Sequence, residues 1–518
     1  MTRLKHVLSL AFSAAMLGID GYVVRVEADS APGSPNLTII GLPDRALGEA
    51  RERVRAAIFN SGFAYPAGRL LVNLSPADVR KEGPSFDLPI ALALLGIDEQ
   101  IDRLALQSFA ALGELALDGT LRPVHGILPM VLGARNAGFA KLIVPQSNAE
   151  EAALVEGIEL YAVDSLQSAV AVVLGSGAKW RTKTRAPQIP AREEFFYGDF
   201  ADVRGQAGAK RALEIAAAGG HNVLFVGPPG CGKTMLARRI PSILPPMSPN
   251  EALEVTKIYS VAGLLGTQPG IVQARPFRFP HHTISQTALV GGGSAVKPGE
   301  ISLAHHGVLF LDELPEFTRS SIEVMRQPLE EGMVTIARAA GTFTYPARFM
   351  LVASMNPCPC GYRGTRSAEC RCDDAAVARY VAKLSGPLLD RIDLQIEVAR
   401  VPFDDMVRTE HADRSADIRE RVIAARQRQR SRFAGTPVSC NADIPGSAVR
   451  TYCSLDAKAM ELLAQASSRR QFSARALDRI ARAARTIADL AEREHIEPPD
   501  VAEAIQYRSL ERLDTRAA

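Results

Sequence analysis

The stretch NVLFVGPPGCGKTMLARRI, residues 222–240, decides the fold of this chain. It opens on an apolar run typical of a buried strand, continues through a glycine-rich loop and ends in a helix-forming segment. This is the context in which the pattern GxxxxGK[ST] forms a phosphate-binding loop, or P-loop. The matching residues are Gly227, Pro228, Pro229, Gly230, Cys231, Gly232, Lys233 and Thr234. Backbone N–H groups and the helix N-terminus face the phosphates in such a loop, so we expect Lys233 to neutralise the β- and γ-phosphates of ATP and Thr234 to ligate Mg²⁺.

Polar side chains end two further apolar runs. GVLFLDEL, residues 307–314, carries Asp312 and Glu313 at the end of its run. Asp312 is suited to the magnesium shell and Glu313 to polarising the attacking water. FMLVASMN, residues 349–356, ends at Asn356, which we expect to orient that water; the alternative is a turn residue that only closes a strand.

Length and composition indicate a multidomain protein without a strong charge. The chain has 518 residues, a formal net charge of +3 and 47% hydrophobic residues. Contacts with nucleic acid must therefore come from local Arg and Lys clusters. The first 18 residues imitate a secretory signal, but the alternation in YVVRVEAD, residues 22–29, favours a strand. The P-loop and the clustered cysteines favour a cytoplasmic protein, and no segment is long and apolar enough to span a membrane.

The patterns predict an α/β chain with four parts. Residues 1–172 alternate strands and helices, and residues 173–198, rich in Gly, Pro and Arg, are interpreted as a linker. Residues 199–400 carry nearly continuous apolar strands, which indicate a parallel sheet covered on both faces. Residues 401–518 predict helices.

The order of these motifs resembles an AAA+ ATPase, once GPLLDRID (residues 386–393) and SARALDRI (residues 473–480) are included. More narrowly, nearly the whole chain resembles the magnesium-chelatase-like branch, in the ComM/YifB family. The resemblance implies a P-loop parallel-sheet core with a C-terminal helical lid, assembled as a homo-oligomeric ring, a hexamer. A neighbouring subunit then supplies an arginine finger, expected to be Arg391, while Arg475 serves as a second sensor that reaches the γ-phosphate from the lid. The alternative for either arginine is an ion pair on a helix surface, since Arg479 and its neighbours show that arginine is common here.

Two insertions distinguish this core. RPFRFPHHTISQTALVGGG, residues 275–293, is glycine-rich, and MVTIARAAGTFTYPARF, residues 333–349, predicts a β-hairpin. Related ring helicases resemble this plan and aim such hairpins into the central channel. Arg338, near the hairpin tip, and Arg275 and Arg278 are expected to contact DNA phosphates. The alternative is that these loops only pack between subunits.

Four cysteines follow Asn356 directly. Cys358, Cys360, Cys370 and Cys372 form a CxC–x9–CxC cluster. Four thiolates can close a tetrahedral Zn²⁺ site, although the spacing is tighter than the usual CxxC; disulfides compete but are disfavoured in a reducing compartment. The adjacent pairs His281-His282 and His305-His306 invite a metal site as well, but a structural role is favoured, because neighbouring side chains on a strand point to opposite faces.

The N-terminal part resembles the Lon-type protease domain, an α+β fold. EGPSFDLPIAL, residues 82–92, places Ser85 where that family carries its nucleophile. In RPVHGILPMVLGARNAGF, residues 122–139, Leu128 stands where the family's catalytic Lys is expected. Leucine cannot accept a proton, so we predict an inactive protease shell in which the Ser85 hydroxyl caps the following helix.

The resemblance implies an ATP-driven motor that acts on single-stranded or branched DNA and moves branch points during recombination and natural transformation. The alternatives are a magnesium-chelatase motor subunit, an ATPase that remodels protein partners, and an ATP-dependent protease, which the missing lysine disfavours.

Overall fold

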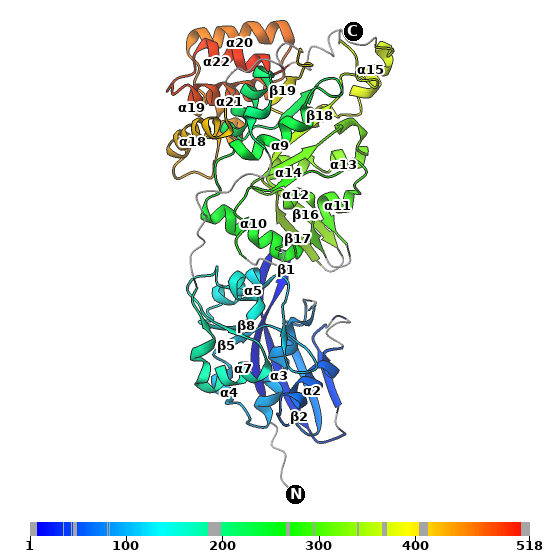
Figure 1. The fold of residues 1–518 in the computed structure, drawn as a ribbon, viewed down its shortest axis with the longest axis vertical. Helices are drawn as coiled ribbons and strands as arrows, with labels where there is room; N and C mark the ends of the chain where they lie inside the picture. Colours follow the sequence, from blue (N-terminus) through cyan, green and yellow to red (C-terminus); the bar gives the residue numbers. More distant parts are fainter. Residues whose placement is uncertain are drawn as a thin grey trace.

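The computed structural model describes residues 8–508, apart from residues 35, 43, 45–48, 80, 82, 185–197, 266–269, 294–295, 339–340, 365–369 and 403–412. The N-terminal sheet lies at one end of an elongated molecule, a second sheet occupies the middle, and the C-terminal helices lie at the far end (Figure 1). The predicted α/β class is confirmed.

An eight-stranded mixed sheet organises the N-terminal part, in the order β10-β9-β8-β5-β1-β2-β4-β3. The strands are β1 (Ser9–Leu17), β2 (Asp20–Ala31), β3 (Asn36–Ile40), β4 (Arg69–Ser75), β5 (Phe109–Ala111), β8 (Lys141–Pro145), β9 (Glu159–Val163) and β10 (Arg181–Thr182), with a separate ribbon of β6 (Glu114–Leu115) and β7 (Leu121–Arg122). Along β2 every second residue, Val24, Val26 and Ala28, is fully buried. Within the segment that imitates a signal, Ser9–Leu17 forms β1, which agrees with the preference for a strand; residues 1–7 lie outside the described residues.

Among the described residues, the helices that accompany this sheet are α2 (Ala50–Asn60), α3 (Asp87–Ile97), α4 (Arg103–Leu106), α5 (Ile127–Asn136), α6 (Ala149–Ala152) and α7 (Leu166–Ala171). All eleven residues of α3 are buried, which explains its apolar sequence on every side. Helix α5 packs so closely on β2 that a Cβ on Gly133 would lie 2.4 Å from the backbone of Gly21. Only glycine fits at this crossing.

Five parallel strands form the central sheet, in the order β12-β15-β18-β11-β19. They are β11 (Val223–Val226), β12 (Phe277–Arg278), β15 (Val308–Leu311), β18 (Met350–Met355) and β19 (Leu394–Glu397). Residues of β11, β15 and β18 alternate between two apolar cores: Val223 and Phe225 face one, and Leu224 and Val226 face the other. The prediction of a parallel sheet covered on both faces is therefore confirmed.

Helices and short strands surround this sheet: α8 (Ala207–Gly219), α9 (Lys233–Ile243), α10 (Pro249–Ala262), α11 (Gln286–Val290), α12 (Glu300–Leu303), α13 (Arg319–Glu323), α14 (Arg326–Glu331), α15 (Asp374–Val381), α16 (Gly386–Leu389), β13 (Gly291–Gly292) and β14 (Lys297–Pro298). The predicted hairpin exists as β16 (Met333–Arg338) paired with β17 (Gly341–Pro346). It lies beside the N-terminal domain, where Phe343 approaches Gly18 (Figure 1).

The C-terminal helices are α18 (Ser415–Arg432), α19 (Val449–Tyr452), α20 (Ala457–Arg470), α21 (Ala474–Leu490) and α22 (Pro498–Gln506). They share one apolar core with α8, α9 and the central sheet, so this helical domain is fixed directly to the sheet layer.

Helix α10 connects the two sheet domains. Ser260 donates a 2.5 Å hydrogen bond to Glu151 of the N-terminal domain, and Lys257 pairs with Asp20 at 2.6 Å. Glu151 also accepts the backbone N–H of Leu128 at 3.1 Å.

The segment interpreted as a linker is folded over part of its length. Gly177–Trp180 forms a 3₁₀ turn, and β10 (Arg181–Thr182) pairs with β9. Residues 185–197 lie outside the described residues. The N-terminal sheet thus extends past the predicted boundary at residue 172, because Trp180 packs against its apolar core.

The close crossing of α5 and β2 gives a stability prediction. Gly133→Ala is expected to lower the free energy of unfolding by about 1–3 kcal/mol, because the added methyl group overlaps backbone that cannot move cheaply. Gly208→Ala, in a helix with open space around the new Cβ, is expected to leave stability unchanged or raise it by up to about 1 kcal/mol. Urea unfolding followed by circular dichroism compares them; equal midpoints for wild type and Gly133→Ala would contradict the packing described.

Candidate active site

The P-loop connects the end of β11 to the start of α9. Gly230 and Gly232 have φ of 75° and 97°, in the left-handed region that favours glycine. A Cβ on Gly227 would lie 2.2 Å from the Val398 carbonyl oxygen, whereas a Cβ on Gly230 would meet nothing within 4 Å. The loop is therefore packed against the sheet on one side and open on the other, which suits a phosphate chain.

Lys233 lies across this loop. Its Nζ donates to the carbonyl oxygens of Gly227 at 2.6 Å and Pro228 at 2.9 Å, and to Asn356 Oδ1 at 3.2 Å. Burial lowers the pKa of the Lys233 ammonium group, while the nearby acidic groups oppose this effect. Lys233 and Asn356 thus meet at one edge of the sheet.

Two oxygen ligands for a divalent cation also meet there. Thr234 Oγ1 donates to Asp312 Oδ2 at 2.7 Å, and Ser354 Oγ donates to the other Asp312 oxygen. A hydroxyl beside a carboxylate fits Mg²⁺, which is bound through few protein oxygens plus phosphates. Ser354 was missed by the sequence interpretation, although it lies in β18, two residues before Asn356.

Glu313 follows Asp312 in the left-handed conformation, with φ of 53°. Its backbone N–H donates to Ser354 Oγ at 3.2 Å, and its side chain is 54% exposed. The carboxylate lies 3.8 Å from His282 Nδ1. His282 comes from the glycine-rich insertion and was interpreted only as structural; its place beside Glu313 connects that insertion to the site.

A pocket of about 330 Å³ adjoins the P-loop, lined by Gly227, Pro228, Val398, Ala399 and Arg363 among others. Gln206 connects the P-loop to the segment after β19. Its side-chain amide donates to the carbonyl oxygens of Cys231 at 3.1 Å and Ala399 at 2.7 Å. Gln206 was also missed; a lone Gln before a helix carries no distinctive signal.

Arg391 and Arg475 lie together but apart from this pocket. Both line a cavity of about 430 Å³ with Arg479 and Arg482, and among the described residues neither lines the pocket beside the P-loop. Arg391 forms an ion pair with Glu330. Burial and the guanidinium groups of Arg326, Arg475 and Arg479 lower the pKa of Arg391. The concentration of cationic groups favours an anionic partner at this face.

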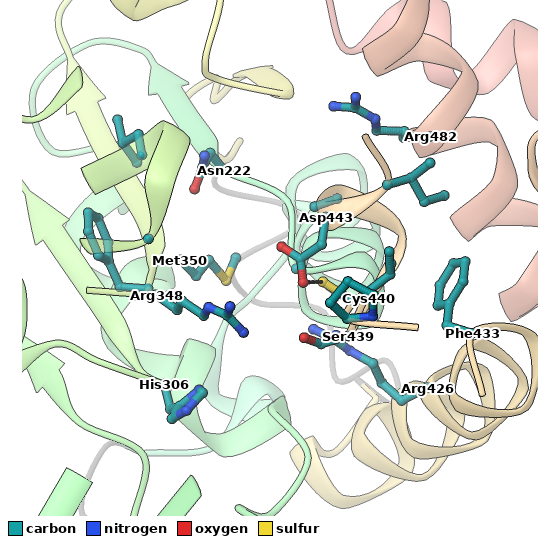
Figure 2. Close-up of a pocket in the computed structure, with 18 of the residues that line it drawn as sticks. Asn222, His306, Arg348, Met350, Arg426, Phe433, Ser439, Cys440, Asp443 and Arg482 are labelled. Carbon is teal, nitrogen blue, oxygen red and sulfur yellow. Dashed lines mark hydrogen bonds between the residues drawn. The ribbon is translucent and has the colours of Figure 1, made fainter. Parts of the chain in front are cut away.

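A larger cleft of about 980 Å³ adjoins the same arginines, between the central sheet and the C-terminal helices. Figure 2 shows Asn222, Met350 and Arg348 on one side and Phe433, Arg426 and Arg482 on the other. Inside it Cys440 donates to Asp443 at 3.2 Å. Arg391 lines both spaces, although only 6% of the residue is exposed.

The three arginines expected on DNA differ in their surroundings. Arg275 donates to the carbonyl oxygens of Pro245 and His306, each at 2.6 Å, and pairs with Glu251. Arg278 makes two 2.6 Å bonds to Glu300. Both guanidinium groups are therefore occupied within the chain, which was not foreseen.

Arg338 is exposed at the last pair of the hairpin, opposite Gly341. Its Nη2 lies 3.0 Å from the point that a Cβ on Gly292 would occupy. The two insertions thus lie side by side, and Arg338 presents its charge outward.

The four clustered cysteines converge. Cys358 Sγ lies 3.3 Å from Cys360 Sγ and 3.7 Å from Cys370 Sγ, and all four sulfurs lie within 4.8 Å of one another. A disulfide needs about 2.05 Å, and all seven cysteines are free. Zinc–sulfur bonds of about 2.3 Å in a tetrahedron place sulfurs about 3.8 Å apart, so the donor set fits zinc.

The second histidine pair also approaches a potential ligand, Glu254. His305 and His306 contact its Oε2 through Nε2, at 3.1 and 2.9 Å. His305 Nδ1 accepts the backbone N–H of Arg348 at 3.0 Å. Because that bond leaves the proton on Nε2, His305 acts as a donor to Glu254 rather than as a metal ligand. The structural interpretation of this pair agrees with that bond, but its stated reason was wrong, because the two side chains lie in a turn and both reach Glu254.

In the N-terminal domain Leu128 is fully buried in α5, where the related proteases are expected to carry their base. Ser85 lies in the 3₁₀ turn Pro84–Phe86, and its hydroxyl makes no capping bond; the N-cap of α3 is Phe86. The capping prediction was wrong, because this turn runs directly into the helix. Asp87 pairs instead with Arg53 at 2.8 Å, although burial raises its pKa to about 6.

Comparisons with known proteins match the whole chain. A family model described as magnesium chelatase, subunit ChlI, matches residues 199–406, and models of its other parts match residues 26–148 and 412–508. The uncharacterised protein YifB of Escherichia coli is 43% identical over 508 residues, covering 98% of both chains. The competence protein ComM of Haemophilus influenzae is 43% identical over 514 residues, again covering 98% of both.

The chain belongs to the ComM/YifB family of magnesium-chelatase-like AAA+ proteins. The family supports an ATPase that uses ATP and Mg²⁺. A Lon protease of Roseiflexus castenholzii is 34% identical over 139 residues, 25% of this chain and 17% of that protein, in agreement with the predicted Lon-like N-terminal region. In the part of the chain that the structure describes, no helix combines the length and apolar character needed to cross a membrane.

The position of Glu313 gives a direct prediction. Glu313→Gln is expected to lower the ATP hydrolysis rate by about 10²–10⁴-fold, because the amide cannot accept the proton of the attacking water. Binding of ATP is expected to persist, since Lys233 and the loop are intact. Steady-state hydrolysis and equilibrium binding of a fluorescent ATP analogue measure the two effects.

Glu316→Gln is the matched control, three residues further on and exposed; it is expected to hydrolyse ATP as the wild type does. Equal rates for Glu313→Gln and the wild type would remove Glu313 from the site.

Proposed function

We propose that this protein is an ATP-driven, ring-forming DNA motor that promotes branch migration during homologous recombination and natural transformation. The single observation that carries the proposal is the position of Arg338. It is exposed on the β16–β17 hairpin, and this hairpin lies beside the glycine-rich insertion, whose His282 reaches Glu313 in the ATP site. The full-length similarity to a competence protein supports it. We also propose a cytoplasmic location and the division into residues 1–172, 173–198, 199–400 and 401–518, in which the start of the second part, as far as β10, still packs on the N-terminal sheet.

The proposed chemistry assigns a role to each residue at the sheet edge. Asn356 orients a water, which gives its proton to Glu313 as its oxygen attacks the γ-phosphorus. The bond from that phosphorus to the β–γ bridging oxygen breaks, and ADP leaves. Lys233 and the N–H groups of Gly230 and its neighbours hold the phosphates. Thr234 and Asp312 would hold Mg²⁺, which would supply positive charge beside the phosphates.

We propose that Arg391 and Arg475 complete this site in a neighbouring subunit of a hexamer. The two share one cavity, away from the P-loop of their own chain. Arg475, expected to act as a lid sensor, is thus proposed on the same face as the finger. A guanidinium carries a fixed charge and a donor fork suited to the charge that develops on a transferring phosphoryl group.

DNA contact is proposed chiefly through Arg338. A ring of such side chains would hold the phosphate backbone without reading sequence, which suits a motor that moves along DNA. Arg275 and Arg278 remain predicted contacts of DNA phosphates. To make these contacts, the two arginines would have to leave their ion pairs with Glu251 and Glu300.

We further propose a structural Zn²⁺ at Cys358, Cys360, Cys370 and Cys372, supported by the convergence of the four sulfurs within 4.8 Å of one another. Metal analysis of freshly purified protein is expected to give one zinc per chain.

A second candidate function is a magnesium-chelatase motor or a protein-remodelling ATPase that does not act on DNA. The family models named for the chelatase subunit favour it. The Lon-like region and the cysteine cluster favour the DNA motor.

ATP hydrolysis without DNA, with single strands, with duplex and with a four-way junction distinguishes these functions. We expect stimulation by single strands or junctions, because a motor couples turnover to its track, with Glu313→Gln as the blank. Equal rates in all four conditions, with the oligomer assembled, would contradict the DNA motor and favour protein partners.

Arg338→Ala is expected to weaken DNA binding about tenfold and to lower DNA-stimulated hydrolysis, while hydrolysis without DNA stays unchanged. The loss of a phosphate contact also reduces the salt dependence of binding. Arg469→Ala, an exposed arginine of α20, is the control. Fluorescence anisotropy across a salt series measures both; if Arg338→Ala and Arg469→Ala behave alike, the hairpin does not hold DNA.

A further inference from the structure

The loop that carries the first two cysteines lies directly against the nucleotide site. Gly361, next to Cys360, has φ of 85°, and a Cβ there would lie 2.7 Å from Pro229 Cδ and 3.8 Å from Asn356 Cγ. Gly361 N–H donates to the Cys358 carbonyl oxygen at 2.9 Å, which closes a tight turn. The cysteine turn is thus in contact both with the P-loop and with the residue expected to orient water.

The same loop forms part of the pocket wall. Arg363 and Gly364 line the pocket together with Gly227 and Pro228. Arg363 pairs with Asp374 of α15 at 2.7 Å. From the same helix, the Tyr380 hydroxyl accepts a hydrogen bond from the backbone of Asn356. Helix α15 therefore contacts both the cysteine loop, through Asp374, and Asn356, through Tyr380.

This loop has little apolar support of its own. Of the four cysteines only Cys358 is fully buried; the other three are half-buried. A segment without a core needs cross-links to keep one conformation, and a tetrahedral metal supplies four. The position of Asn356 and Pro229 then depends on whether the four sulfurs are held together.

We propose that zinc held by the four cysteines is a positioning element of the ATP site. Its binding fixes the turn at Gly361 against Pro229 and Asn356, and its loss slows hydrolysis by releasing Asn356 from the orientation that water activation needs. This rests on the ATPase function and the zinc site proposed above. The cysteines act through Asn356 and do not touch the nucleotide themselves.

The first test removes two ligands far along the chain from Asn356. The double variant Cys370→Ser/Cys372→Ser is expected to lose zinc and to lower kcat for ATP hydrolysis by about 10- to 100-fold, as small misplacements of reacting groups do. KM is expected to change little, because the phosphate contacts of the P-loop remain. Cys453→Ala, a buried thiol outside the cluster, is expected to keep both zinc and kcat.

The second test separates the metal from its contact. Gly361→Ala keeps all four thiols but adds a methyl group that overlaps Pro229. It is expected to retain one zinc per chain and still lose kcat. In an Asn356→Ala background, removing the two cysteines is expected to cost little more, because both changes act through the same residue.

Metal content, circular dichroism and kcat are measured for each full-length variant. Should the double variant misfold, Gly361→Ala decides on its own. Wild-type kcat in Gly361→Ala with zinc bound, or full additivity with Asn356→Ala, would overturn the proposal while leaving the ATPase intact. A wild-type protein that holds no zinc would overturn it as well, whereas a wild type that hydrolyses no ATP would contradict the proposed function itself.

Discussion

The in-register parallel pairing of β11, β15 and β18 is the constraint on which the site depends. Val226 pairs with Met355 and Leu311 with Ala353, so the three strands end together at one edge of the sheet. Parallel strands present their carboxyl ends at the same edge, and ligands bind in the crevice outside these ends. Residues that are far apart in the chain therefore meet at this edge. Thr234 bonds to Asp312, and Lys233 bonds to Asn356. The apolar cores on both faces of the sheet hold that register.

Several elements from different parts of the chain surround this edge of the sheet. The glycine-rich insertion brings His282 to Glu313, and the hairpin beside it carries Arg338 outward. The cysteine loop contacts Pro229 and Asn356 from another side. The arginines at Arg391 and Arg475 lie on a separate face, in a cavity of their own. On the proposed assignment of Arg391 and Arg475, the groups of the site are divided between two faces of one chain, and contact between chains would complete it.

Much of this arrangement was predictable because it is local or follows from strand ends. Each group of site residues follows an apolar run: the P-loop follows β11, the acidic pair follows β15 and Asn356 follows β18. Parallel pairing brings the carboxyl ends of these strands together. The hairpin was marked by its alternation around Ala-Gly. What could not be predicted depends on side-chain partners distant in sequence. No sequence periodicity marks the ion pairs of Arg275 and Arg278 with acidic residues. The same is true of the bonds from Gln206 to two carbonyl oxygens and of the approach of His282 to Glu313. The folded start of the segment interpreted as a linker was hidden because its Gly and Lys content resembles an exposed loop, although Trp180 packs on the sheet.

The most direct measurement of the central claim, that a second copy of the chain completes the ATP site, is a subunit-mixing assay. Lys233→Ala removes the phosphate contact of a subunit's own site, and Arg391→Ala removes the proposed finger, so each protein alone is expected to hydrolyse almost no ATP. If Arg391 acts on the neighbour's nucleotide, mixed rings contain interfaces with an intact P-loop on one side and an intact finger on the other. Hydrolysis is then expected to reappear, to a fraction of the wild-type rate set by the mixing ratio. No recovery at any ratio, in mixtures shown to exchange subunits, would contradict a shared site and place the role of Arg391 within its own chain.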